Sequence, residues 1–268
     1  MKPIKSKSVV FITGAFAGHH TWDKWISYYE GRGYSCIAPP WPYKNATPQV
    51  LRTRHPNDVS LANTRLSQIV EYYKKIIEQQ PEKPIVIGHS MGGLVAQLLL
   101  QHNIMAAGIA LHSMPPRGIY TLKFFFKWLP LKITGIFSSG SNSHLISFKE
   151  WQHAYTNGAP YEEQKYTYQK DVVPQSKQIM RDLFTKGAKV DFSASREPLL
   201  IISGTTDRIT PTALNYSNYI MYNRNNSSIT DYKEFKNKNH FSYRLCSWKE
   251  EADYIMDWLD IISNPAIV

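Results

Sequence analysis

Cysteine is scarce in this sequence of 268 residues, which contains only Cys36 and Cys246. Two cysteines cannot form the several bridges of a disulfide-stabilised domain, and neither has the close spacing of a metal-binding pair. We therefore expect both side chains to be buried as small apolar groups. Internal repeats and low-complexity tracts are also absent from the sequence.

Long apolar runs are absent as well. No uncharged apolar segment is long enough to cross a membrane. The apolar run after the basic N-terminal residues is short, which is typical of a buried strand rather than of a signal peptide. We therefore expect a cytoplasmic protein, and the hydrophobic share of 43% suits a globular core.

Acidic residues are outnumbered, with 21 Asp and Glu against 31 Lys and Arg, for a net charge of +10. Such an excess can indicate a nucleic-acid or anionic-membrane partner. Here the basic residues are scattered along the whole chain, and no dense basic helix or nucleic-acid motif occurs. We therefore expect a soluble basic protein with no nucleic-acid partner.

Short apolar runs alternate with helical patterns along most of the chain. The runs are rich in β-branched residues, as strands buried on both faces of a parallel sheet should be. We expect strands at residues 8–12, 34–38, 84–88, 108–112, 198–204 and 232–235, and helices at 22–30, 66–77, 92–102 and 248–259. This alternation predicts an α/β fold with a doubly wound, mostly parallel sheet.

The alternation stops between residues 114 and 190, where helical signals occur without a strong buried strand. We interpret residues 114–190 as a mainly helical cap inserted into a core formed by 1–113 and 191–268. The aromatic and basic run at 120–131 indicates either a cap helix that lines an apolar pocket or a lid that contacts lipid. Its short length favours the first interpretation, in which Trp128 is a candidate pocket residue.

A serine lies at a sharp turn between a predicted strand and a predicted helix. Residues 88–93 read GHSMGG, and the spacing Gly-x-Ser-x-Gly suits a turn too tight for side chains at the flanking positions. Such a turn exposes the serine hydroxyl above the edge of the sheet. A hydroxyl is a weak nucleophile that needs a base and hydrogen-bond donors for the oxyanion. We predict that Ser90 is the nucleophile.

Asp207 and His240 complete the order nucleophile, acid, histidine that this turn predicts. Asp207 follows the strand at 198–204 and His240 follows the strand at 232–235. Because parallel strands end at one edge of a sheet, we expect both side chains beside Ser90. A simple turn role for Asp207 is the alternative. Other carboxylates lie within or at the end of the cap and lack this placement: Asp171, Asp182 and Asp191.

The other histidines are weaker candidates for the base. His112 ends a strand but precedes the acid in the chain, and His89 flanks the nucleophile, where we expect it to pack as a neighbour. The adjacent pair His19 and His20 could suggest a metal site. No third ligand recurs at a helpful spacing, so we expect no metal.

Two backbone N–H groups should hold the oxyanion. One is expected from Met91, which follows the nucleophile at the start of a helix. The other is expected from the loop after the first strand, where we assign Ala15. The adjacent Phe16 is the alternative donor and a candidate wall of the substrate pocket.

Four segments together resemble the α/β-hydrolase superfamily. They read TGAFAGHHTW at 13–22, GHSMGG at 88–93, DRITP at 207–211 and NHF at 239–241. The first is similar to the oxyanion loop of small plant esterases and hydroxynitrile lyases, in which His-Gly-Ala leads to a tryptophan. Here Thr13 replaces that histidine, which affects loop packing more than a backbone donor. The resemblance covers nearly the whole chain, and the cap is the least similar part.

The resemblance implies an α/β-hydrolase fold and a serine hydrolase. Dehalogenases and epoxide hydrolases of this fold carry aspartate at the elbow, so Ser90 argues against both. We expect cleavage of a small-molecule carboxylic ester with an apolar acyl or alcohol part, without a cofactor. Lyase, haloperoxidase or cofactor-free oxygenase chemistry stays open, as does a non-enzymatic receptor for a small ligand. The sequence argues against membrane contact, and it indicates no particular oligomeric state.

Overall fold

A six-stranded sheet forms the centre of the computed structural model, which describes residues 4–119, 142–225 and 227–263. Its strands lie in the order β2-β1-β3-β4-β5-β6, and every neighbouring pair is parallel. The strands are β1 (Ser8–Ile12), β2 (Ser35–Ile37), β3 (Ile85–His89), β4 (Ala107–Leu111), β5 (Leu199–Gly204) and β6 (Thr230–Phe235). The predicted fold class is confirmed.

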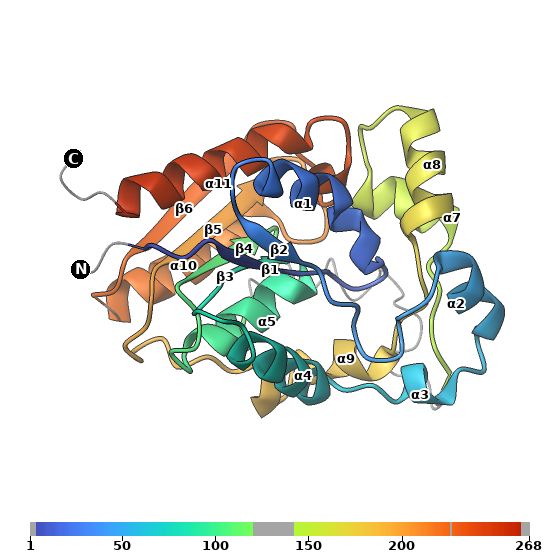
Figure 1. The fold of residues 1–268 in the computed structure, drawn as a ribbon. Helices are drawn as coiled ribbons and strands as arrows, with labels where there is room; N and C mark the ends of the chain where they lie inside the picture. The colour runs from blue at the N-terminus through green and yellow to red at the C-terminus, as the bar shows by residue number, and fades with distance from the viewer. Residues whose placement is uncertain (1–3, 120–141, 226, 264–268) are drawn as a thin grey trace.

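The central strands are buried on both faces because helices cover both sides of the sheet. All residues of β1, β3, β4 and β5 are buried. Figure 1 shows α1 (Asp23–Glu30) and α11 (Trp248–Ser263) on one face, with α4 (Leu66–Glu78) and α5 (Met91–Leu100) on the other. The register aligns Gly88 with Ile12 and Ala110, so the ends of β1, β3 and β4 meet at one edge.

Two helices illustrate how the apolar pattern decides burial. In α4, Leu66, Ile69, Tyr73 and Ile77 are buried at helical spacing. In α5 every residue is buried, because the helix packs against β1, β3 and β4 as well as α4. This packing fixes the N-terminal end of α5 at the edge where β3 ends.

Among the described residues, three helices lie where the apolar pattern predicts no helix. They are α2 (Pro48–Arg54), α3 (Val59–Ala62) and α10 (Thr212–Asn225). The first two are short and are defined by their caps: the Thr47 side chain accepts from the Val50 amide, and Asp58 accepts from the Leu61 amide.

The insertion between β4 and β5 is mainly helical, as expected. Its described part contains α7 (Phe148–Glu150), the π-helical turn η2 (Trp151–Tyr155), α8 (Tyr161–Asp171), α9 (Lys177–Asp182) and the 3-10 turn η3 (Lys186–Ala188). It contacts the loop after β1, where the Val173 amide donates to the Phe16 carbonyl at 2.9 Å. The boundaries at 114 and 190 stay a prediction. Trp128 and the whole aromatic and basic run at 120–131 lie outside the described residues.

The expected burial of both cysteines is wrong. Cys36 is half-buried on the edge strand β2, and Cys246 is exposed in the loop before α11. Both are free thiols. None of the helices in the described ranges is long and apolar enough to span a membrane.

Candidate active site

Ser90 lies at the turn between β3 and α5 in a conformation that few residues adopt. Its backbone angles are φ 55° and ψ −116°. A Cβ on Gly88 would lie 2.1 Å from the Gly92 carbonyl oxygen, and one on Gly92 would lie 2.2 Å from the Ile12 carbonyl oxygen. Glycine is therefore required on both sides of Ser90, which confirms the physical reason for the motif.

The three predicted triad residues meet in one hydrogen-bonded line. Nε2 of His240 lies 2.9 Å from Oγ of Ser90, and Nδ1 of His240 lies 2.9 Å from Oδ2 of Asp207. All three side chains are buried. Because Asp207 can only accept as a carboxylate, Nδ1 of His240 donates, and Nε2 then offers its lone pair to the Ser90 hydroxyl.

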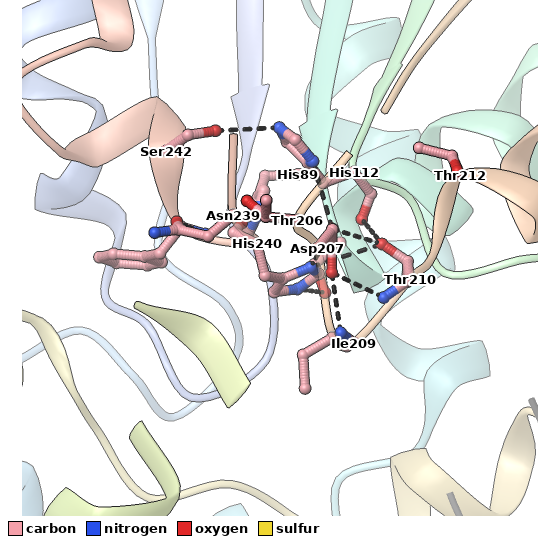
Figure 2. A network of polar contacts seen from close by, with 12 residues as sticks. His89, His112, Thr206, Asp207, Ile209, Thr210, Thr212, Asn239, His240 and Ser242 are labelled. Carbon is pink, nitrogen blue, oxygen red and sulfur yellow. Dashed lines mark hydrogen bonds and ion pairs between the residues drawn. The ribbon is translucent and has the colours of Figure 1, made fainter. Parts of the chain in front are cut away.

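Asp207 is held at both carboxylate oxygens. The amides of Ile209 and Thr210 each donate to Oδ1 at 2.8 Å, and the Thr210 hydroxyl donates to Oδ2 at 2.9 Å (Figure 2). Burial alone would raise the pKa of this carboxyl. The charges and hydrogen bonds of His240 and His112 outweigh burial and hold the pKa well below its usual range. Asp207 is therefore an anion at neutral pH.

His89 packs beside the triad, as expected for a neighbour. Its ring stacks on Tyr243 with centroids 4.1 Å apart, and its Nε2 lies 2.7 Å from the His240 carbonyl oxygen. Burial, together with the charges of His240 and His112, lowers the pKa of His89 well below its ordinary value. The neutral ring therefore donates from Nε2 and supports the backbone that carries His240.

The expected oxyanion donors border Ser90 from two elements. A Cβ on Gly14 would lie 2.9 Å from Cβ of Ser90, so the loop after β1 is in close contact with the nucleophile. The Met91 amide begins α5, where helix N–H groups have no partner in the preceding turn. Within the described ranges the amides of Ala15, Phe16 and Met91 make no hydrogen bond to protein. Free amides beside the nucleophile are what an oxyanion needs.

Aromatic residues border the site, and one of them was missed by the sequence analysis. Tyr155, in the π-helical turn of the cap, places its ring 5.4 Å from the ring of His240 and 6.3 Å from the ring of Phe16. Phe16 has φ 63° and is 2% exposed. A turn with no apolar period gave no signal for Tyr155. The candidate pocket role of Phe16 stays a prediction.

His112 and Glu251 also touch the site, and neither was assigned a role. Nδ1 of His112 lies 3.2 Å from Oδ2 of Asp207, and its Nε2 lies 2.9 Å from Oε1 of Glu251. The available signal was that His112 follows β4, which lies between the strands that carry Ser90 and Asp207.

The remaining carboxylate and histidine candidates lie away from the triad. Asp171 is buried against Arg244 and His20, and Asp182 is paired with Arg65. Asp191 is exposed and accepts from Ser193. In the part of the chain that the structure describes, no three side chains form a metal-binding group.

Comparison with known proteins places the chain in a family. A model of the alpha/beta hydrolase family matches residues 9–243. The chain belongs to the alpha/beta hydrolase family, which confirms the predicted resemblance and the predicted class of enzyme. A search of curated protein sequences gives no match.

Solved structures share the fold over nearly the whole chain. A monoacylglycerol lipase from Paleococcus ferrophilus is similar with a TM-score of 0.68 and 20% identity, over 96% of this chain and 95% of that one. A methylesterase from Arabidopsis has a TM-score of 0.67 and 16% identity, over 95% and 99%. A pyrethroid hydrolase from Sphingobium faniae has a TM-score of 0.66 and 18% identity, over 94% and 97%. At these identities the likeness shows the fold.

Proposed function

We propose that the chain is a serine hydrolase that cleaves a carboxylic ester through an acyl-enzyme on Ser90. The observation that carries the proposal is the line of hydrogen bonds from Ser90 through His240 to Asp207, at the edge where the strands end. Ser90 has a histidine nitrogen on one side and unpaired backbone amides on the other, and this arrangement is suited to acyl transfer.

The chemistry follows from the position of each proton. His240 takes the proton of the Ser90 hydroxyl at Nε2 while Oγ attacks the ester carbonyl. The carbonyl oxygen becomes an oxyanion, which the amides of Met91 and Ala15 would hold. Asp207 stabilises the imidazolium of His240, which then gives its proton to the leaving alcohol. A water molecule, deprotonated in turn by His240, releases the acid and restores Ser90.

We propose that the substrate is a small molecule with an apolar acyl or alcohol part. Phe16 and Tyr155 support this because they place aromatic rings beside His240. The names of three structural neighbours, a lipase, a methylesterase and a pyrethroid hydrolase, fit ester substrates. The mechanism uses only groups of this chain and needs no cofactor. A cytoplasmic location stays a prediction from the sequence.

The first test is Ser90→Ala in a p-nitrophenyl ester assay. Loss of the nucleophile should lower kcat/KM by a factor of about 10³ or more, with the fold intact by circular dichroism. Ser113→Ala is the matched control: Ser113 is also buried at this edge of the sheet, but it bonds Gln97 and the Met114 carbonyl instead of the triad.

A fluorophosphonate probe separates the proposal from its alternatives. It should label wild type and Ser113→Ala at Ser90, and should leave Ser90→Ala unlabelled. A folded wild-type protein that stays unlabelled would contradict the acyl-enzyme. That result would favour lyase or oxygenase chemistry if turnover persists, and a ligand receptor if only binding is seen.

A further inference from the structure

A second imidazole lies behind the triad, on the carboxylate that orients His240. His112 immediately follows β4, and its side chain is completely buried. Its Nδ1 lies 3.2 Å from Oδ2 of Asp207, the same oxygen that faces His240. Figure 2 shows the ring of His112 joined to Asp207 on one side and to Ser242 on the other.

The other nitrogen of His112 faces a second buried carboxylate. Nε2 lies 2.9 Å from Oε1 of Glu251, a residue of α11 that is 0% exposed. Ser242 donates its hydroxyl to the same Glu251 oxygen at 2.8 Å, so Ser242 offers His112 an oxygen rather than a proton. Both ring nitrogens therefore point at acceptors.

A doubly protonated ring donates to both of these acceptors. A neutral imidazole has one N–H, and its other nitrogen would aim a lone pair at a carboxylate oxygen. Burial lowers the pKa of His112, but the charge and hydrogen bonds of Glu251 and Asp207 outweigh burial and raise the pKa to about 9. His112 is therefore an imidazolium at neutral pH.

The remaining neighbours of His112 do not supply a competing charge. The rings of His89 and His240 lie 6.2 Å and 6.3 Å away, and His89 is neutral. Oγ1 of Thr210 lies 3.0 Å from the His112 carbonyl oxygen and carries no charge. Two anions and one cation thus form a cluster with one net negative charge, which faces His240.

We propose that His112 is a positioning residue for the triad, and that Glu251 keeps His112 in its cationic form. The proposal rests on the proposed function. His112 donates to Asp207 and so fixes the carboxylate against His240, while Glu251 cancels the charge of His112. Without Glu251, the positive charge of His112 would weaken the electrostatic stabilisation that Asp207 gives to the imidazolium formed at His240. The proton on His112 stays in place throughout the reaction.

The kinetic test uses His112→Gln together with Glu251→Gln. Changing both residues removes one cation and one anion, so the net charge of the cluster is kept and no carboxylate is left without its partner. We expect kcat to fall about 10-fold to 100-fold, as for loss of one charge-assisted hydrogen bond in the transition state. KM should change by less than about threefold, because His112 does not touch substrate.

Asp182→Asn is the matched control for a merely structural effect. Asp182 is a buried carboxylate that bonds Arg65 and the Leu66 amide, away from the triad. At comparable loss of stability it should keep kcat within about twofold of wild type. An unchanged kcat in the double variant, with wild type labelled at Ser90, would overturn the positioning role and leave the proposed function standing.

A second measurement does not depend on turnover. Nitrogen-15 NMR of histidine-labelled wild type should show an imidazolium signal at pH 7 that is absent from the double variant and titrates near pH 9. A neutral His112 at pH 7 would overturn the proposal. If the imidazolium signal is present but the fluorophosphonate probe does not label Ser90, the proposed function is overturned. In that case His112 is a cation, but Ser90 does not form the covalent adduct that the acyl-enzyme requires.

Discussion

Asp207 shows at the scale of single residues how the site is pre-organised. Its two oxygens accept from two amides and one hydroxyl before His240 is counted. These donors fix the orientation of the carboxylate, while the charges and hydrogen bonds of His240 and His112 keep its pKa low. His240 is therefore held in the one tautomer that leaves Nε2 free to accept the proton of Ser90.

Asp207→Asn tests this role with little change in shape. An amide is neutral and can donate to Nδ1 of His240, which favours the tautomer that cannot act as the base. We expect kcat to fall by about 10³-fold to 10⁴-fold, as for the same change in serine proteases. Steady-state kinetics on a p-nitrophenyl ester would measure it. The control is Asp182→Asn, which should have activity close to that of wild type. If Asp207→Asn also has activity close to that of wild type, the assignment of Asp207 is contradicted.

The proximity of Ser90, Asp207 and His240 could be predicted from sequence, because their order along the chain and the parallel sheet both constrain it. Ser90 and Asp207 follow strands with clear apolar runs, and His240 follows the weaker pattern at 232–235. His112 follows a strand as well. It precedes the acid in the chain, so the expected order makes it a weak candidate, and its contact with Glu251 from the distant helix α11 has no sequence signal.

At the scale of elements, the turn between β3 and α5 depends on close backbone approach. Gly92 lies against the end of β1, where a Cβ would be 2.2 Å from the Ile12 carbonyl oxygen. No rotamer change can relieve a contact with backbone. The approach of β1 to α5 also brings the loop after β1 against Ser90.

Gly92→Ala should therefore destabilise the fold strongly. We expect the free energy of unfolding to fall by about 3 kcal/mol or more, the upper end of overpacking costs. Gly187→Ala is the control, since a Cβ there would lie an ordinary 3.5 Å from Oγ1 of Thr185. Urea titration of both variants measures the difference. Equal stability of the two would show that the close approach is not a constraint.

Elements with a clear apolar period were predicted, and elements without one were missed. α4 and α11 each bury one apolar face. α10 reads TALNYSNYIMYNRN, in which asparagine and tyrosine interrupt any apolar stripe. Tertiary packing against β5 and β6 decides its conformation, and sequence patterns do not contain that information. The burial of Cys246 was predicted wrongly for a similar reason, because it depends on a loop.

At the scale of the whole molecule, buried ionisable groups couple stability to pH in opposite directions. His112 has its pKa raised from 6.5 to about 9, so it stabilises the fold below pH 6.5 and loses this effect as the pH rises through 9. Burial lowers the pKa of Lys44 from 10.5 to about 7. Between pH 7 and 10.5 the unfolded chain binds more protons at Lys44 than the native protein does, so Lys44 makes stability increase with pH.

These opposing contributions make a single stability curve ambiguous, but the difference between two proteins isolates His112. We subtract the free energy of unfolding of the His112→Gln and Glu251→Gln double variant from that of the wild type. This difference retains the contribution of His112 and cancels that of Lys44. Between pH 6.5 and 9 the native wild type binds the extra proton, so this difference should fall with pH. Its slope should approach about 1.4 kcal/mol per pH unit, the value for one proton.

Urea unfolding at several pH values from 6 to 9.5 measures this difference directly. The lower limit excludes Asp207, whose lowered pKa makes it stabilise the fold above pH 3.8 and lose that effect only as the pH falls. Asp182→Asn retains His112, Glu251 and Lys44, and its curve should run parallel to that of wild type. If the curve of the double variant also runs parallel, no proton is held more tightly at His112 in the native protein. The cation behind the triad would then be absent.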